Sequence, residues 1–429
     1  MNVILKNTMN IIENYKWTTH PLIKNFISLT IVQIANYIFP LISLPYLVRV
    51  LGPEKYGLIS FAQSFIGYFI LITNYGFDLS ATREISINRD QKEKLSEIFN
   101  SVMYAKFILL FSCFLILLSL LQLEKFRSDY RLYIFTFGII LGQTLFPLWL
   151  FMGLERMKYI TVFVVLERAV YTICIFIFIK RVNDYIYVPL LNTAGYMTSG
   201  ILSLGVTLFY FKIKIKLPEW HKIWLQIKRG WDSFVATICF SLYSTSNTFI
   251  LGLFSNNTIV GYYSAAEKLI YAVQRMLVPL SQTVYPYISK KVEEEKMKSL
   301  RFIKKIFYIN FVIGLLLFFV IFLGANILSD ILLGPSYKES IYVIRIFALL
   351  PLVSAILNVL GFQTMLPFKM DKILSRTLFG AAMLNIVFAF ILIPIFKHIG
   401  AAIAYLLTMI SACLALYLLL KRKNINILA

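Results

Sequence analysis

The segment 261–286, GYYSAAEKLIYAVQRMLVPLSQTVYP, is long enough to cross a bilayer as a helix, yet it contains Glu267, Lys268 and Arg275. A charge near the middle of a spanning helix costs about 2.5 to 3.5 kcal/mol on insertion scales. Such a side chain therefore usually faces a partner or a water-filled cavity. These three residues are the strongest candidates for chemistry in the chain.

The spacing of the two cations places them on one side of this helix. Lys268 and Arg275 are about two turns apart with Tyr271 between them, whereas Glu267 lies about 100° further round. The pattern predicts a cationic stripe facing a cavity that binds anions. In the alternative interpretation, the charges only tie helices together or extend to an interface.

The composition is that of a polytopic membrane protein. The chain has 429 residues, of which 59% are hydrophobic and 15% charged, and its mean hydropathy is +0.76. Residues 1–20 are polar and lack the pattern of a cleaved signal peptide, so we expect the first span to act as the targeting signal. The formal charge of +21 lies mainly between apolar runs, which argues against nucleic-acid binding.

Cysteine and histidine positions offer no enzymatic or metal-binding pattern. All four cysteines lie in apolar segments, and the three histidines are far apart in predicted loops. The chain contains no Walker loop, Rossmann fingerprint or catalytic triad. We therefore expect neither enzyme nor ATP-driven pump, with no cofactor or metal.

Twelve apolar runs of spanning length predict an all-α integral membrane protein. They lie near 24–48, 57–79, 98–121, 132–153, 159–179, 186–211, 231–254, 259–284, 306–328, 341–365, 376–394 and 400–420. Five cations fall inside these runs: Lys106, Arg168, Lys268, Arg275 and Arg345.

The remaining cations alternate between the connections. The terminal segments and every second loop carry 28 Lys and Arg, whereas the opposite loops carry nine. By the positive-inside rule, both termini are expected in the cytoplasm, with the outward loops short and without a soluble domain.

A basic stretch, 212–230, divides the chain into predicted units 1–211 and 231–429. It mixes Trp220 and Trp224 with lysines, which suits either an amphipathic helix on the anionic leaflet or an ordinary linker. Six spans lie on each side of it. The second and eighth spans both begin with GxxSxA, at Gly57 and Gly261. An even number of intervening spans preserves orientation, so we expect two parallel repeats of six helices.

Polar positions in the first and seventh spans indicate a cavity between the two halves. The first span contains Gln33 and Asn36, and the seventh contains Ser241, Ser244 and Thr248 at spacings of three and four. Stripes of this kind also arise from helix packing alone.

Several segments resemble a known family. These are 25–89, which includes LVRVLGPEKYGLISFAQSFIGYFILITNYGFDLSATREIS, 153–161 (GLERMKYIT), 230–252 (GWDSFVATICFSLYSTSNTFILG) and 261–290. Together they resemble the Wzx-type O-antigen flippases, in the polysaccharide exporter family of the multidrug/oligosaccharidyl-lipid/polysaccharide superfamily. The resemblance covers nearly the whole chain.

The resemblance implies two six-helix bundles around a V-shaped cavity, lined mainly by the first, second, seventh and eighth helices. It implies export of an undecaprenyl-diphosphate-linked oligosaccharide across the bacterial cytoplasmic membrane by alternating access, alongside a polysaccharide polymerase and a chain-length regulator. Lys268 and Arg275, with Arg168, Lys106 and Arg345, would then bind the diphosphate.

The energy source stays open at this point. A proton or Na⁺ gradient could act through an acid in or near a span, for which the candidates are Glu267, Asp232 and Glu84.

Three other functions share this hydropathy. A membrane-embedded polysaccharide polymerase or glycosyltransferase would need a large outward loop, which the chain lacks. A cation-coupled drug exporter of the same superfamily would need a cavity that does not repel cations. An exporter of teichoic-type or capsular repeat units fits the sequence as well as an O-antigen flippase does.

Overall fold

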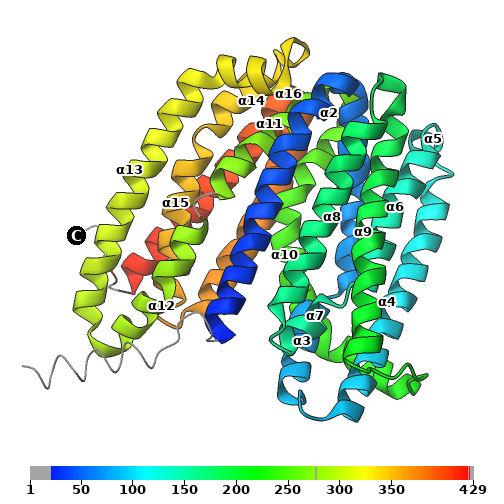
Figure 1. Ribbon diagram of the computed structural model, residues 1–429. Coiled ribbons are helices and arrows are strands. Elements are labelled where there is room, and N and C mark those ends of the chain that lie inside the picture. Colours follow the sequence, from blue (N-terminus) through cyan, green and yellow to red (C-terminus); the bar gives the residue numbers. More distant parts are fainter. Residues whose placement is uncertain (1–20, 276–277, 424, 426–429) are drawn as a thin grey trace, which may run out of the picture.

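The computed structural model describes residues 21–275, 278–423 and 425, apart from the side chains at 21–23, 26, 236, 239–245, 278–283, 286, 296 and 297. Within these ranges every regular element is helical (Figure 1). The long helices are α2 (Pro21–Asn74), α3 (Phe77–Ile87), α4 (Lys92–Leu120), α6 (Tyr130–Leu145), α8 (Met157–Phe178), α9 (Tyr187–Gly205), α10 (Trp220–Phe254), α11 (Asn257–Arg275), α12 (Val278–Glu294), α13 (Lys296–Leu328), α15 (Leu350–Leu360) and α16 (Asp371–Arg422). Shorter elements are α5 (Glu124–Arg127), α7 (Leu148–Gly153), α14 (Ser340–Phe347), η2 (Val182–Ile186), η3 (Val206–Tyr210), η4 (Ser329–Leu333), η5 (Pro335–Tyr337) and η6 (Gly361–Met365).

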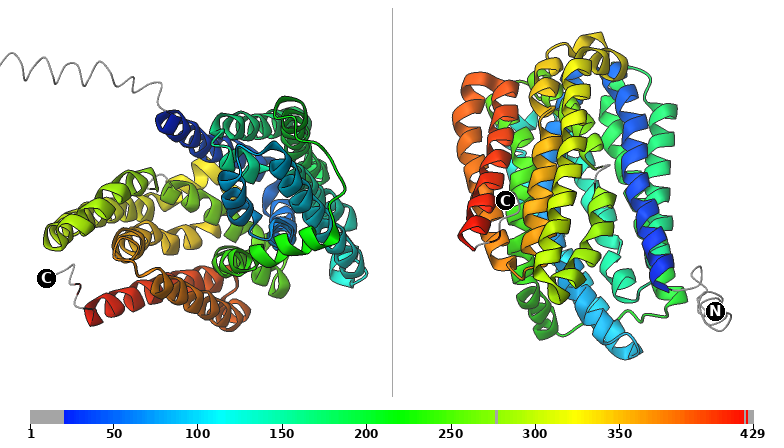
Figure 2. Two further views of the ribbon diagram at one scale, coloured as in Figure 1. Left: turned by 90° about the horizontal axis from the view of Figure 1, so that it is seen from below. Right: turned by 90° about the vertical axis from the view of Figure 1, so that its left-hand side faces the viewer.

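The helices form two bundles, as predicted. The N-terminal bundle contains α2 to α9, in which α8 packs against α2 and α9, and α6 packs against α9. The C-terminal bundle contains α10 to α16, in which α13 packs against α15 and α10 packs against α16. The bundles converge near α5 and α14 and diverge towards α3 and α12 (Figure 1). We call these the closed end and the open end. Viewed from the open end, the bundles lie on opposite sides (Figure 2, left).

Hydropathy and the helices agree on the membrane-spanning character of the chain. Seven segments of the described chain are long and apolar enough to cross a membrane. The first of these, Ile27–Ile87, and the last, Asp371–Arg422, each contain two predicted spans. The predicted spans 186–211, 231–254 and 259–284 fall outside this set but are helical, as α9, α10 and α11 with α12. The expected all-α membrane fold is thus confirmed.

The boundary between the first two predicted spans is a sharp bend within α2. Gly52 has φ 69° and ψ 171°, a left-handed conformation that glycine adopts without a side-chain penalty. Pro53 follows, and proline disfavours helical geometry in the residue before it. The bend lies at the closed end and turns the chain back into the bundle (Figure 1).

The basic stretch between the halves is attached to the N-terminal bundle. Its second part belongs to α10, which starts at Trp220 and continues into the seventh predicted span. Ile213 and Ile223 are buried in a cluster with Phe77 and other residues of the N-terminal bundle. Trp220 and Trp224 are 65% and 58% exposed. The exact domain boundaries stay a prediction.

Candidate functional site

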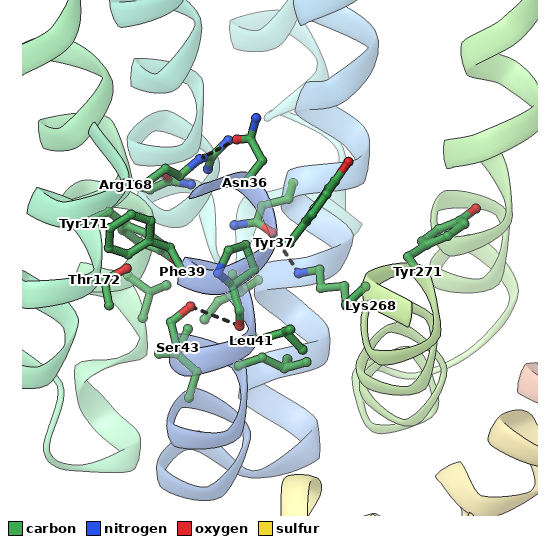
Figure 3. Close-up of a pocket in the computed structure, with 18 of the residues that line it drawn as sticks. Asn36, Tyr37, Phe39, Leu41, Ser43, Arg168, Tyr171, Thr172, Lys268 and Tyr271 are labelled. Carbon is green, nitrogen blue, oxygen red and sulfur yellow. Dashed lines mark hydrogen bonds between the residues drawn. The ribbon is translucent and has the colours of Figure 1, made fainter. Parts of the chain in front are cut away.

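A cavity of about 320 Å³ lies between the bundles (Figure 3). Four helices form it: both parts of α2, and α8, α9 and α11. Its polar or charged lining residues are Asn36, Tyr37, Ser43, Tyr56, Gln63, Arg168, Tyr171, Thr172, Asn192, Lys268, Tyr271 and Arg275. The remaining lining residues are apolar.

The cationic stripe of α11 faces this cavity. Lys268, Tyr271 and Arg275 all line it, as their spacing on one helix face requires. Lys268 extends from α11 towards α2, where its Nζ donates to Gln63 Oε1 at 3.3 Å (Figure 3). The same Nζ lies 5.1 Å from the centre of the Tyr56 ring. The partners of Lys268 are therefore neutral and leave its charge available to an anion.

Arg168 approaches the cavity from α8, on the opposite side of α2 (Figure 3). Its Nε donates to Asn36 Oδ1 at 3.3 Å, so two residues predicted separately meet here. Its Nη1 lies 3.5 Å from Glu167 Oε1, and Glu167 is buried. Glu167 thus partly compensates the charge of Arg168, while Arg168 itself lines the cavity.

Glu267 points away from the cavity, between α10 and α11. Its two carboxylate oxygens accept hydrogen bonds from Thr248 Oγ1 and from the Tyr263 hydroxyl, each at 3.1 Å. Neighbouring Asn247 is fully buried, and neither atom of its side-chain amide has a hydrogen-bond partner in the described part of the chain. Glu267 makes no ion pair within 4 Å there. A half-buried carboxylate whose hydrogen bonds come only from neutral donors is stabilised when a cation or a proton neutralises it.

Three uncharged cavity groups have no hydrogen-bond partner in the described part of the chain. Tyr56 OH, Thr172 Oγ1 and Asn192 Oδ1 are buried and unpaired, and all three residues line the cavity. They could pair with the hydroxyls of a ligand, since an unmade hydrogen bond costs about 1 to 3 kcal/mol. No sequence pattern predicted these three residues, because a single polar residue in an apolar span does not reveal which helix face it occupies. For Tyr56, its place directly before the GxxSxA motif was a usable signal.

Two predicted cavity cations lie elsewhere, which corrects the prediction for them. Lys106 is 2% exposed inside the N-terminal bundle, near enough to Asp78 of α3 for an electrostatic interaction. Its helix, α4, contributes nothing to the cavity wall. Arg345 is exposed on α14 and donates to Asn326 Oδ1 of α13 at 3.3 Å. In both cases packing turns the helix face that carries the cation away from the cavity.

Two of the acids predicted for ion coupling lie near the open end. Glu84 of α3 accepts hydrogen bonds from Gln226 Nε2 at 2.8 Å and Arg229 Nη1 at 2.5 Å. This ion pair joins α3 to the start of α10. Asp232 is exposed on α10. Glu84 and Glu267 are both half-buried, and of these two only Glu84 forms an ion pair within 4 Å among the described residues.

Of the polar residues predicted to line the cavity, some do and others do not. Asn36 lines it, whereas Gln33 lies one turn earlier on α2 and accepts a hydrogen bond from Tyr37 OH at 2.6 Å. Thr248 binds Glu267 behind the cavity wall. The side chains of Ser241 and Ser244 lie outside the described residues.

The described cavity lining contains three cations and no Asp or Glu. The part of the chain that the structure describes also holds no group of three or more His, Cys, Asp or Glu side chains that could bind a metal ion. An electropositive, partly hydroxylated cavity of this kind attracts anions and repels cations.

Comparison with known proteins identifies the family of this chain. The model of the family "Polysaccharide biosynthesis protein" matches residues 22–292. The chain belongs to this family. It is 34% identical over 404 residues to an Escherichia coli K12 protein named "Putative O-antigen transporter", covering 94% of this chain and 97% of that protein. A Shigella dysenteriae protein of the same name is 30% identical over 396 residues, covering 90% and 96% of the two chains. The resemblance noted from the sequence is confirmed.

Solved structures show the same fold at low sequence identity. The lipid II flippase MurJ in an inward closed conformation superposes with a TM-score of 0.68 at 14% identity, covering 93% of this chain and 87% of that one. An inward-facing multidrug resistance MATE family transporter superposes with a TM-score of 0.66 at 15% identity, covering 94% of this chain and 98% of that one. An outward-facing MATE family transporter superposes with a TM-score of 0.54 at 15% identity, covering 94% of this chain and 95% of that one. The chain therefore has the fold of these membrane proteins.

Proposed function

We propose that the protein is a flippase that moves an undecaprenyl-diphosphate-linked oligosaccharide, an O-antigen or capsular repeat unit, from the cytoplasmic to the outer leaflet of the bacterial cytoplasmic membrane. The observation that carries this proposal is the charge of the cavity. Lys268, Arg275 and Arg168 line it, and the described lining contains no acid.

This arrangement suits a lipid-linked diphosphate. Arg and Lys neutralise phosphate oxygens through charge-assisted hydrogen bonds, which are about twice as strong as neutral ones. The unpaired groups of Tyr56, Thr172 and Asn192 can pair with sugar hydroxyls. Only the headgroup needs the cavity, because the polyprenyl tail is stable in lipid. The protein thereby avoids the cost of moving unpaired polar groups through hydrocarbon.

The direction follows from the charge of the loops. The connections at the open end, near α3, the start of α10 and α12, belong to the strongly basic set (Figure 1). By the positive-inside rule this end faces the cytoplasm together with both termini, so the cavity described here receives substrate from the cytoplasmic side. The higher TM-score with an inward-facing than with an outward-facing transporter supports this assignment. A polysaccharide polymerase and its chain-length regulator would use the exported product.

Export against a gradient needs an energy source, which we assign to a proton or Na⁺ gradient acting at Glu267. Its half-buried carboxylate accepts hydrogen bonds from Thr248 and Tyr263, and the fully buried side chain of Asn247 lies next to them. Lys268, the next residue, points into the cavity. A cation that binds Glu267 would therefore change the charge directly behind the substrate site. Glu84 and Asp232 are weaker candidates because Glu84 pairs with Arg229 and Asp232 is exposed.

The fold shared with multidrug transporters supports a second candidate, a cation-coupled exporter of drugs or metabolites. The cationic lining opposes a cationic drug but not an anionic metabolite.

A deletion strain tests the proposal. If the protein is a flippase, the strain should lose surface polysaccharide and accumulate lipid-linked repeat units on the cytoplasmic leaflet, and the wild-type gene should restore both. In proteoliposomes, the purified protein should move a fluorescent polyprenyl-diphosphate-linked sugar between leaflets. Normal surface polysaccharide in the deletion strain, with altered export of small molecules, would establish the exporter instead.

A further inference from the structure

Two cations of the N-terminal bundle reach across the closed end to the C-terminal bundle. The first is Arg49, which lies in α2 just before the bend at Gly52. Its Nη2 donates to the carbonyl oxygen of Ile331 and lies 3.4 Å from that of Asp330. Both carbonyls belong to η4, the last turn of the long helix that begins as α13.

The second is Lys125 of α5, the short helix in the loop between α4 and α6. Its Nζ donates to the carbonyl oxygens of Gly252 at 2.6 Å and Leu253 at 2.8 Å. These carbonyls are in the last turn of α10, which packs against α16. The ammonium group also lies 5.6 Å from the centre of the Phe61 ring in α2.

The two contacts use the same physical device. The last four carbonyls of a helix have no intrahelical partner, and the helix dipole places partial negative charge on them. A cation there completes the hydrogen bonds and interacts favourably with the dipole. In each contact the cation comes from the N-terminal bundle, and the helix end belongs to a helix packed in the C-terminal bundle.

Both contacts also flank the closest approach of the two bundles, where Gly57 of α2 meets α11. Two aromatic stacks lie in the same region: Phe249 of α10 stacks on Phe61 and Phe65 of α2, with ring centres 5.7 and 5.9 Å apart. The cations are at the exposed rim, and the glycine and aromatic contacts lie inside it.

We propose that Arg49 and Lys125 are latches that hold the closed end shut, and that both release when the cavity opens to that side. Separating the bundles there must break these bonds, since each bond joins one bundle to the other. The freed carbonyls and cations would then be hydrated, which makes the latches reversible at a modest cost. Together they would set how often the empty protein opens outward.

This inference depends on the two-bundle fold and not on the proposed substrate. It can therefore be tested with protein that has no substrate bound, and its failure would leave the proposed function untouched.

The test measures the width of the closed end directly. Spin labels are placed at cysteines replacing Ser128, beside α5, and Ser336, in η5, in a variant without the native cysteines. Both serines are exposed and belong to different bundles. Distances are measured by pulsed electron resonance in lipid nanodiscs without substrate, using only protein that elutes as a folded species.

The double variant Arg49→Gln/Lys125→Gln should increase the population with a long distance by about three- to tenfold, as loss of a few partly exposed charge contacts implies. Lys125→Arg with Arg49→Lys should restore the short distance. The matched control is Arg127→Gln, which removes an exposed cation from the same helix, α5. A distance distribution in the double variant that equals that of the control would overturn the proposal.

A second measurement avoids purification. Ile59 lines the closed-end part of the cavity and is 2% exposed. In cells, a cysteine replacing Ile59 should react several times faster with an impermeant maleimide in the Arg49→Gln/Lys125→Gln background than in the Arg127→Gln background. Equal reaction rates in the two backgrounds would show that Arg49 and Lys125 do not control opening of the closed end, and would overturn the proposal.

Discussion

Gly57 of α2 and Gly261 of α11 meet at the closed end with no room for a side chain between their helices. A Cβ atom at Gly57 would lie 1.8 Å from the Asn257 carbonyl oxygen and 2.5 Å from the Gly261 amide nitrogen. A Cβ atom at Gly261 would lie 2.0 Å from the Pro53 carbonyl oxygen. These glycines begin the two GxxSxA motifs. The two copies of the repeated motif therefore contact each other where the halves of the chain meet.

The glycine contact predicts that the smallest added side chain blocks closure. Gly57→Ala and Gly261→Ala should each reduce export at least about tenfold, because the atoms that an added Cβ would meet are backbone atoms and cannot rotate away. Surface polysaccharide and protein abundance in membranes are the measurements. Gly67→Ala on the same helix is the matched control, since a Cβ atom there meets nothing within 4 Å. Normal export by both closed-end variants would show that the bundles need not touch.

Removing charge from the α11 stripe should impair export without loss of protein. Lys268→Ala and Arg275→Ala should each lower the flipping rate about ten- to hundredfold, the effect expected from losing a charged hydrogen bond to phosphate. Lys268→Arg should retain more activity than Lys268→Ala. Flipping is measured in proteoliposomes and abundance by immunoblot. Full complementation by both alanine variants would refute a substrate role, and lower abundance would instead indicate that the charges only tie helices together.

Arg168 and Arg345 form a matched pair that separates position from charge. Both are intramembrane arginines bonded to an asparagine, but only Arg168 lines the cavity. Arg168→Gln should lower flipping strongly, whereas Arg345→Gln should leave it within about twofold of normal. Equal loss in the two variants would argue that net charge, and not the cavity, matters.

The orientation of the chain can be measured with reporter fusions. Alkaline phosphatase fused after Asn256, at the closed end, should be active because that loop is expected outside. A fusion after Gln226, at the start of α10, should be inactive. The opposite result would reverse the assigned direction of transport and the side of every loop.

Glu267 can be tested for ion coupling with an isosteric change. Glu267→Gln keeps the hydrogen bonds with Thr248 and Tyr263 in reach but cannot carry a charge. The variant should bind substrate normally in proteoliposomes and lose the dependence of flipping on an imposed proton or Na⁺ gradient. Gradients of each ion applied separately distinguish the two. If flipping by the variant still follows a gradient, Glu267 is only structural and Asp232 and Glu84 become the candidates.

Properties that depend on local composition and residue spacing were predictable from the sequence. Hydropathy predicted the membrane fold, because about 20 apolar residues cross a bilayer whatever surrounds them. The seven-residue interval placed Lys268 and Arg275 on one helix face, which the cavity lining reflects. The GxxSxA motifs indicated two related halves.

Which helix faces meet depends on the packing of segments that are far apart in the chain. Lys106 and Arg345 look as suitable in the sequence as Arg168, but their positions depend on how α4 and α14 rotate against neighbours far along the chain. The same holds for the unpaired groups of Tyr56 and Asn192, whose faces only packing reveals. The two latches could not be predicted from sequence patterns, because the groups that Arg49 and Lys125 bind are backbone carbonyls. Every residue has a carbonyl, so residue types cannot show which ones a distant cation will reach.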